Sequence, residues 1–275
     1  PQWWCCLLIV SSANACGIEV VEYLHLTKHL DCHAQASEFH KVSKSLEELY
    51  NYLSFPLHLL KLCEFLCFRN RKVQFDYCLT YSSFFPTPPF FLAGDTTPFP
   101  IQAEVTLQTN FFGTRAVSSE LLPLIKPQGR VVNVSSMASL RYLKNCSPEL
   151  QQKFLSDTIT EEELVGLMNK FVEDAKKGVH EKEGWPTMAY GVSKIGVTVL
   201  SRIHAKQLNE QRKGDNILLN ACCPGWVKTD LAGPRAPKSV EEGAETPVYL
   251  ALLPPGVTEP HGQFVSEKMV EKWEV

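Results

Sequence analysis

The spacing of apolar residues in this 275-residue chain becomes regular at about residue 95. Residues 101–125 repeat apolar positions at intervals of three and four, which predicts a helix that ends before residues 126–129, Lys-Pro-Gln-Gly. Short β-rich runs predict strands buried in a parallel sheet. These runs span 130–136, 216–225 and 262–267. A long helical stretch holds residues 190–208. Helices that alternate with strands predict an α/β fold with a doubly wound parallel sheet.

An insertion of helical period separates the first of these strands from the long helix. It covers about residues 146–178, and Thr160 followed by Glu163 forms the pattern of a capping box. We therefore expect an inserted helical segment between two strands of the sheet.

The first 93 residues have a different composition. They contain seven of the ten cysteines and a single glycine, Gly17. Residues 45–53 favour a capped helix and residues 72–81 alternate like a strand, without the turn residues that a sheet requires. Residues 82–93 are rich in Ser, Phe, Pro and Leu, which pyrimidine-rich codons encode. Our hypothesis is that 1–93 are translated non-coding sequence, an atypical region before the α/β portion at 94–275; a diverged N-terminal domain is the alternative.

Composition and charge narrow the class of protein. With 44% apolar residues and a net charge of −3, the chain is typical of a soluble globular protein and lacks the basic bias of a nucleic-acid binder. No apolar run reaches the roughly 18 residues that span a bilayer. Residues 3–15 resemble a signal peptide that lacks its positive leader. The cysteine spacings form no disulfide framework, which favours reduced thiols and a cytoplasmic location.

The sharpest chemical signal is the pair Tyr190 and Lys194 in the segment Tyr-Gly-Val-Ser-Lys. Positions i and i+4 of a helix share one face, so the phenol and the ammonium can meet the same ligand. A neighbouring cation favours the phenolate and brings a phenol closer to the range useful for proton transfer at neutral pH. The pair can therefore protonate a carbonyl oxygen, although the spacing alone also fits an incidental surface pair.

Two predicted strand ends supply further groups. Ser135 and Ser136 follow the first strand, at the edge where open α/β sheets bind ligands. A hydroxyl there can donate a hydrogen bond to the carbonyl that Tyr190 protonates. Pro224-Gly225 ends the next strand with a turn that lets the backbone approach a flat ligand closely. These features point to one cleft.

Four segments in this order carry a family resemblance: TNFFGT, VNVSS, YGVSK and CCPGWVKT. They resemble the second part of a short-chain dehydrogenase/reductase, which has a Rossmann-like fold, and are most similar to the monomeric NADPH-dependent carbonyl reductases. The resemblance covers about residues 95–275. It implies an oxidoreductase that uses NADPH to reduce ketones, aldehydes or quinones to alcohols, with a small-molecule carbonyl compound as its partner and no nucleic acid or membrane.

The resemblance also implies roles for individual residues. The catalytic residues would be Tyr190 as the proton donor, Lys194, Ser136 and Asn110. The cofactor-binding residues would be Tyr190, Lys194, Pro224, Gly225, Val227, Lys228 and Thr229. The residues at the substrate would be Gln102, Ser136 and Trp226. Asn110 would in addition stabilise a local kink in its helix.

The insertion narrows the subfamily. The separation of Ser136 and Tyr190 is longer than in most of the superfamily. In the monomeric carbonyl reductases such an insertion covers the face that other members use to form oligomers. The resemblance therefore implies a monomer.

Several other residues have simple explanations. Cys222 and Cys223 could include a reactive thiol beside the cofactor, but buried strand cysteines are usually inert. Asn133 and Asn145 match the glycosylation pattern, the first within a predicted core strand. Four upstream residues with zinc-like spacing lack a Cys-x-x-Cys knuckle, so we expect no metal site. These four are His25, His29, Cys63 and Cys67.

The first part of the family pattern is missing. The family has a glycine-rich turn, Thr-Gly-x-x-x-Gly-x-Gly, a basic residue that selects the 2′-phosphate and an Asn-Asn-Ala-Gly turn, and none of them occurs here. Gly17 alone cannot supply a phosphate loop that needs three glycines. Three interpretations stay open: a carbonyl reductase, an inactive truncated relative without dinucleotide binding, and a zinc-binding module fused to a reductase fragment.

Overall fold

The computed structural model describes residues 7–11, 77–81, 96–229, 232–233 and 235–275. Its strands are β1 (Leu7–Ser11), β2 (Tyr77–Tyr81), β3 (Arg130–Val134), β4 (Leu218–Cys223), β5 (Phe264–Ser266) and β6 (Met269–Glu271). Its helices are α4 (Phe99–Leu107), the π-helix η1 (Gln108–Phe112), α5 (Gly113–Leu121), the 3₁₀-helix η2 (Leu122–Leu124), α6 (Met137–Leu143), α7 (Pro148–Leu155), α8 (Glu161–Lys177), α9 (Ala189–Gln211) and α10 (Val240–Ala251).

The strands form one sheet in the order β2-β1-β3-β4-β5-β6. All neighbours are parallel except β5 and β6, which form an antiparallel hairpin. In register, Val134 of β3 lies opposite Ser11 of β1 and Cys222 of β4. The carboxyl ends of the three central strands therefore align at one edge, which is where parallel sheets bind ligands. This confirms the predicted α/β fold with a parallel sheet.

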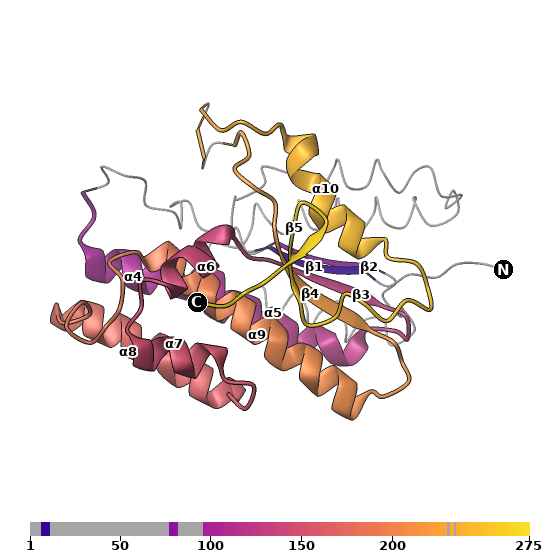
Figure 1. The fold of residues 1–275 in the computed structure, drawn as a ribbon, viewed down its shortest axis with the longest axis horizontal. Coiled ribbons are helices and arrows are strands. Elements are labelled where there is room, and N and C mark those ends of the chain that lie inside the picture. The colour runs from indigo at the N-terminus through magenta and orange to yellow at the C-terminus, as the bar shows by residue number, and fades with distance from the viewer. Residues whose placement is uncertain (1–6, 12–76, 82–95, 230–231, 234) are drawn as a thin grey trace, which may run out of the picture. The chain divides into compact units, whose positions relative to one another are not determined.

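Helices cover both faces of this sheet (Figure 1). Helix α10 packs on one face, against β3, β4 and β1, and α5 and α9 pack on the other. Helices α7 and α8 pack on α9 away from the sheet, and α4, which continues through η1 into α5, packs against both α9 and α8 (Figure 1). Helix α9 is therefore enclosed between the sheet and a second set of helices.

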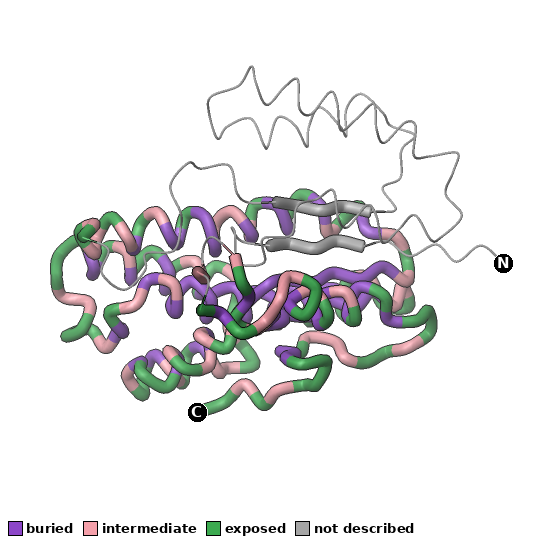
Figure 2. Tube along the Cα trace, turned by 90° about the horizontal axis from the view of Figure 1, so that it is seen from above, coloured by how far each residue is buried: buried purple, intermediate pink, exposed green. Residues whose placement is uncertain are grey.

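This position explains why α9 is buried over most of its surface (Figure 2). A helix with solvent on one side has a single apolar stripe, whereas a helix between two layers is buried all round. Polar residues within α9, such as Ser193, Thr198 and Ser201, are buried as well and form hydrogen bonds. The glycine Gly196 permits close packing, because a Cβ there would lie 2.7 Å from Phe111 and 2.8 Å from Met168.

The insertion forms α7 and α8, as its helical period predicts. The capping box is confirmed: the Thr160 amide donates to the Glu163 carboxylate at 2.8 Å, and the Glu163 amide donates to the Thr160 hydroxyl at 3.1 Å. Helix α8 ends at Gly178, whose φ of 69° is left-handed. The buried indole of Trp185 donates to Asp174 of α8 at 2.9 Å and so ties the following loop to the insertion.

A carboxylate at the start of α8 joins three helices. Glu161 accepts from Arg115 of α5 at 2.6 Å and lies 3.1 Å from the Nε2 of His204 on α9. The hydrogen bond with His204 is the main cause that lowers the pKa of Glu161 to about 2, and Arg115 adds to it. The insertion is therefore held to the body of the domain by a charged group as well as by apolar packing.

Several elements differ from the sequence analysis. Strand β1 lies within the apolar run that resembles a signal peptide and was missed, whereas β2 falls within segment 72–81, whose alternation is that of a strand. Both precede residue 93 and yet pair into the sheet, so strand pairing crosses the expected boundary between 1–93 and 94–275. Helices α6 and α10 and strand β6 were not predicted, and the expected helix at 45–53 lies outside the described residues.

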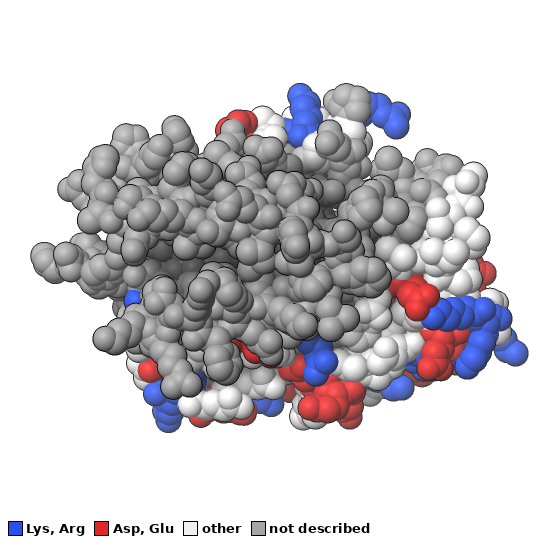
Figure 3. All heavy atoms as spheres, turned by 180° about the vertical axis from the view of Figure 1, so that it is seen from behind, with Lys and Arg blue, Asp and Glu red and all other residues white. Residues whose placement is uncertain are grey.

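Charged side chains on the described surface form mixed pairs. Lys176 of α8 pairs with Glu104 of α4 at 2.7 Å, and Arg202 of α9 pairs with Asp157 at 2.9 Å. Basic and acidic side chains are interspersed where the described residues are visible in Figure 3. Among the described helices, none is both long and apolar enough to cross a bilayer.

Two glycine substitutions of the same kind should change stability in opposite directions. Gly196→Ala places a methyl group against the buried Phe111 and Met168, so we expect the free energy of unfolding to fall by about 1–2 kcal/mol. Gly166→Ala in α8 meets no atom within 4 Å, so better helix propensity should raise it by about 0.5–1 kcal/mol. Urea unfolding measures both; a gain at position 196 contradicts the close packing.

The Glu161 carboxylate should make stability depend on pH. Its folded pKa is depressed from 4.5 to about 2, so its contribution is present above pH 4.5 and lost as pH falls toward 2. Glu161→Gln should cost roughly 2–3 kcal/mol at pH 7 and less than half of that at pH 3 in urea unfolding. Glu162→Gln, at an exposed neighbouring position, is the control. A cost at position 161 that stays constant with pH rules this explanation out.

Candidate active site

A fully buried ammonium lies at the centre of the candidate site. Lys194 of α9 has no exposed surface, and its Nζ donates to the carbonyl of Val134, the last residue of β3, at 2.9 Å. The same Nζ lies 5.5 Å from the ring centroid of Tyr190. The i and i+4 positions of α9 therefore bring the phenol and the ammonium together at the carboxyl end of β3, as the sequence predicted.

Tyr190 occupies the first turn of α9 and is partly buried. The hydroxyl of Ser193 donates to its backbone carbonyl at 2.7 Å. Gly191 follows directly, and a Cβ there would lie 2.3 Å from the ring of Tyr142 on α6. Helices α6 and α9 thus pack closely beside Tyr190. Sequence reasoning missed this contact, because its one signal, a glycine after Tyr190, has many explanations.

The two serines after β3 have different environments. Ser135 is buried, lies 2.6 Å from the Thr198 hydroxyl and donates to the Lys194 carbonyl at 3.1 Å. Ser136 is partly exposed and caps α6, where its Oγ accepts from the amide of Ala138 at 3.1 Å. A hydroxyl that accepts a capping hydrogen bond keeps its own proton to donate. Ser136 is therefore the serine that can donate to a ligand, and Ser135 joins β3 to α9.

Asn110 lies in the π-helical turn η1 between α4 and α5, where a kink was expected. Its Nδ2 donates to the hydroxyl of Ser193 at 3.0 Å, and its side chain is buried. Its Oδ1 is buried as well and has no hydrogen-bond partner. Single π-helical turns often occur at functional sites. Asn110 thus connects to the first turn of α9 through Ser193, a link that sequence spacing does not reveal.

The turn after β4 follows the neighbouring strand end. Pro224 is buried, and Gly225 has a φ of 89°, a left-handed conformation that favours glycine. The amide of Ser135 donates to the carbonyl of Cys222 at 2.7 Å, which joins this strand end to that of β3. The turn therefore lies on the strand next to the one that leads to Ser136.

The other predicted cofactor-binding residues begin the loop after this turn. Val227 is buried against α10, where a Cβ on Gly243 would lie 2.4 Å from it. Lys228 is exposed, and the hydroxyl of Thr229 accepts from the amide of Ala232 at 3.2 Å. Val227 thus has a structural contact of its own, while Lys228 and Thr229 lie in the loop itself.

The predicted substrate residues Gln102 and Trp226 lie on separate elements. Gln102 of α4 is partly buried and donates to the carbonyl of Thr97 at 2.8 Å. Trp226 has 56% of its surface exposed, and its indole donates to the carbonyl of Ala232 at 3.4 Å. Neither contact joins them to the four proposed catalytic residues. Their place at the substrate stays a prediction.

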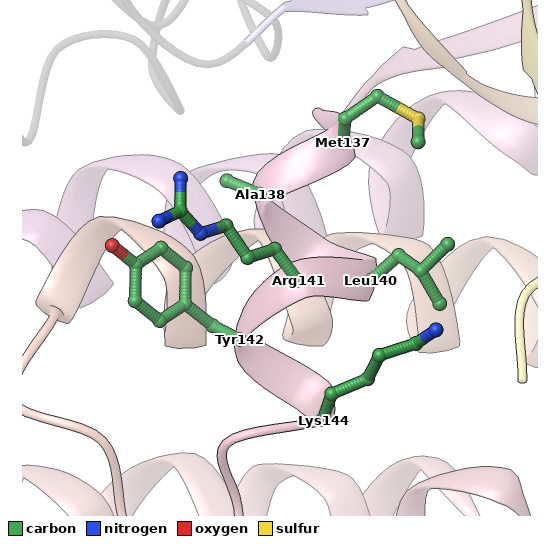
Figure 4. Close-up of a pocket in the computed structure, with 6 residues that line it drawn as sticks. All are labelled: Met137, Ala138, Leu140, Arg141, Tyr142 and Lys144. Carbon is green, nitrogen blue, oxygen red and sulfur yellow. The ribbon is translucent and has the colours of Figure 1, made fainter. Parts of the chain in front are cut away.

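A hollow follows α6 directly after Ser136 (Figure 4). Its lining residues are Met137, Ala138, Leu140, Arg141, Tyr142 and Lys144. The guanidinium of Arg141 lies 5.8 Å from the Tyr142 ring centroid, so the two side chains lie side by side (Figure 4). The hollow therefore combines apolar side chains with two cations.

The cysteines and glycosylation patterns have structural explanations within the described residues. Cys222 and Cys223 are buried, and the Cys223 sulfur accepts from the amide of Gly225 at 3.3 Å. Asn133 is buried in β3 and donates to Ser201 at 2.8 Å, whereas Asn145 is exposed. No group of metal-binding side chains occurs among the described residues, and the four upstream His and Cys residues lie outside them.

Sequence comparison connects this site to known enzymes, although no family model matches the chain. The chain is 80% identical over 183 residues to carbonyl reductase [NADPH] 1 of Homo sapiens, which is 66% of this chain and 66% of that protein. It is 78% identical over 179 residues to carbonyl reductase [NADPH] 1 of Rattus norvegicus, 65% of each chain. The chain thus spans slightly less than two thirds of the length of these relatives.

Comparison of structures shows the fold over more of the chain. Salutaridine reductase from Papaver somniferum superimposes with a TM-score of 0.57 at 24% identity, covering 94% of this chain and 72% of that one. An NADPH-bound carbonyl reductase from chicken fatty liver superimposes with a TM-score of 0.55 at 16% identity, covering 98% and 100%. Over 66% of its length the chain is therefore similar in sequence to carbonyl reductases, and over more of its length it has the fold of these reductases.

Proposed function

We propose that the chain catalyses the NADPH-dependent reduction of carbonyl compounds, namely ketones, aldehydes and quinones, to alcohols. The observation that carries this proposal is the group of polar residues at the end of β3. The buried Lys194 lies between Tyr190 and the Val134 carbonyl, and Ser136 follows Val134 by two residues. This arrangement combines a proton donor, a cation and a hydroxyl donor, which carbonyl reduction requires.

The described residues fit the nicotinamide half of NADPH. Gly225, with its left-handed φ, offers a turn without a side chain, and the buried Lys194 offers an ammonium at the strand edge. We propose that Tyr190 and Lys194 hold the nicotinamide ribose, and that the segment from Pro224 to Thr229 holds the nicotinamide amide and the pyrophosphate. When bound, NADPH supplies the hydride. We assign no residues to the adenine half of NADPH. Gly17, the one glycine in the first 93 residues, lies outside the described residues.

Each side chain has a distinct task in the proposed proton transfer. Ser136 donates a hydrogen bond to the substrate carbonyl and orients it, because the capping contact with Ala138 holds its oxygen in place. Tyr190 gives its proton to the developing alkoxide oxygen. Lys194 stabilises the phenolate that Tyr190 becomes, since opposite charges attract strongly in a buried site.

Asn110 has the fourth task. Its amide holds Ser193 in the first turn of α9, and its unpartnered Oδ1 offers a buried acceptor to the proton relay. Gln102 and Trp226 are proposed to contact the substrate. We assign no metal to this chemistry.

We further propose that the protein is a monomer that acts in the cytoplasm on small molecules. Helices α7 and α8 pack outside α9, which supports a monomer because they cover a helix that would otherwise present an apolar face. Within the described part of the chain, Cys146 and Cys223 form no disulfide, which supports a reducing compartment. Sedimentation velocity of the purified full-length chain tests the oligomeric state.

Binding of NADPH tests the first requirement of this function. We expect the nucleotide fluorescence to change on titration of the full-length chain, with a dissociation constant well below 1 mM, and menadione or an aromatic aldehyde to be reduced with loss of absorbance at 340 nm. No binding at millimolar NADPH would support the inactive truncated relative instead.

Replacement of the proposed proton donor should abolish turnover without abolishing binding. Tyr190→Phe keeps the ring but removes the hydroxyl, so we expect kcat to fall by about 10²–10⁴-fold. The dissociation constant of NADPH should stay within about threefold of the wild-type value. The lost hydroxyl makes one hydrogen bond, whose net free energy in water is only about 1 kcal/mol or less. Tyr249→Phe, on the exposed side of α10, is the matched control and should retain full kcat. A kcat that survives in Tyr190→Phe excludes the assignment.

A further inference from the structure

The loop after the Pro224-Gly225 turn is closed at its base by backbone contacts. Val227 forms a parallel β-bridge with Lys238. The amide of Lys238 donates to the carbonyl of Trp226 at 3.2 Å, and the amide of Lys228 donates to the carbonyl of Lys238 at 2.9 Å. The loop therefore begins at Trp226 and returns to the side of Trp226 at Lys238, just before α10 begins (Figure 1).

The side chain of Lys238 lies across the turn itself. A Cβ on Gly225 would be 2.9 Å from the Cδ and 3.0 Å from the Nζ of Lys238. The Nζ also donates to the carbonyl of Pro224 at 3.5 Å. The absence of a side chain at Gly225 thus makes room for Lys238, whose side chain lies against the turn.

The ammonium of Lys238 has a carboxylate partner on a third element. It forms an ion pair with Glu267, which lies in the two-residue turn of the β5–β6 hairpin. The Lys238 side chain is 24% exposed and that of Glu267 57% exposed. Glu267 and Lys268 have φ values of 50° and 62°, so the hairpin turn holds Glu267 in a left-handed conformation.

The same hairpin turn is anchored independently to α10. Lys268 pairs with Glu245 at 2.7 Å, and the amide of Lys268 donates to the hydroxyl of Thr246 at 3.2 Å. The turn is therefore a fixed support, and Glu267 can hold Lys238 against it.

We propose that Lys238 is a positioning residue: its ion pair with Glu267 forms a clasp that holds the Pro224-Gly225 turn in the conformation that binds the nicotinamide half of the cofactor. This proposal rests on the proposed function in one respect only, namely that the ligand is NADPH. The clasp acts through the backbone of the turn, because the ammonium already has a carboxylate and a carbonyl as partners.

The charges of the two residues allow a direct test on the full-length protein. We expect Lys238→Gln and Glu267→Gln each to raise the NADPH dissociation constant about threefold to fivefold, as expected for a partly exposed ion pair. The double charge reversal, Lys238→Glu with Glu267→Lys, should bring it back to within about twofold of the wild type. Lys272→Gln, which breaks the exposed ion pair between Lys272 and Glu274, is the control and should leave it unchanged.

Three outcomes overturn the clasp. If Lys238→Gln weakens binding while Glu267→Gln leaves it unchanged or tightens it, Lys238 acts on the cofactor phosphates directly. If both single variants weaken binding and the double reversal does not restore it, the effect does not come from the ion pair. Unchanged binding in both single variants is equally contrary to the proposal.

A second measurement separates this proposal from the proposed function. If the wild-type chain does not bind NADPH, the proposed function fails, and amide hydrogen exchange of residues 225–229 still reports on the clasp. We expect faster exchange there in both single variants and a return to the wild-type rate in the double reversal. Equal exchange rates in the wild type and the single variants would overturn the clasp without reference to any ligand.

Discussion

The rest of the site depends on one buried cation. Lys194 has no exposed surface, and its ammonium donates to the carbonyl that ends β3. A buried ammonium is strongly unfavourable without polar partners, so this contact fixes the register of α9 against the sheet. Because Tyr190 lies one turn before Lys194, the same register decides where the phenol lies relative to the strand edge.

The polar groups around this cation have separate structural and chemical tasks. Ser135 and Thr198 join the strand to the helix, and Ser193 links the first turn of α9 to Asn110. These residues hold the backbone beside Ser136 and Tyr190, whose hydroxyls we propose to contact the substrate. A site that must place donors within a fraction of an ångström needs such a supporting layer, since catalytic contacts weaken steeply with displacement.

The supports of the site come from parts of the chain that are far apart. Glu161 of the insertion binds α5 and α9, and Glu267 of the hairpin pairs with a lysine that covers the turn after β4. Each of these two carboxylates lies on an element outside the site and pairs with a side chain from an element that forms or supports the site. Charged pairs of this kind add orientation to apolar packing, which by itself is non-directional.

The sequence by itself determined the long helices and the strands β3, β4 and β5 after residue 95, the capping box of Thr160 and Glu163, and the shared face of Tyr190 and Lys194. These features follow from local backbone geometry, because the periods of helices and strands are visible in the order of the residues. Only the tertiary structure decided that β1 and β2 pair beside β3, that Ser136 and not Ser135 can donate to a ligand, and that Lys238 meets Glu267. Such contacts depend on how distant segments pack, which no local period encodes.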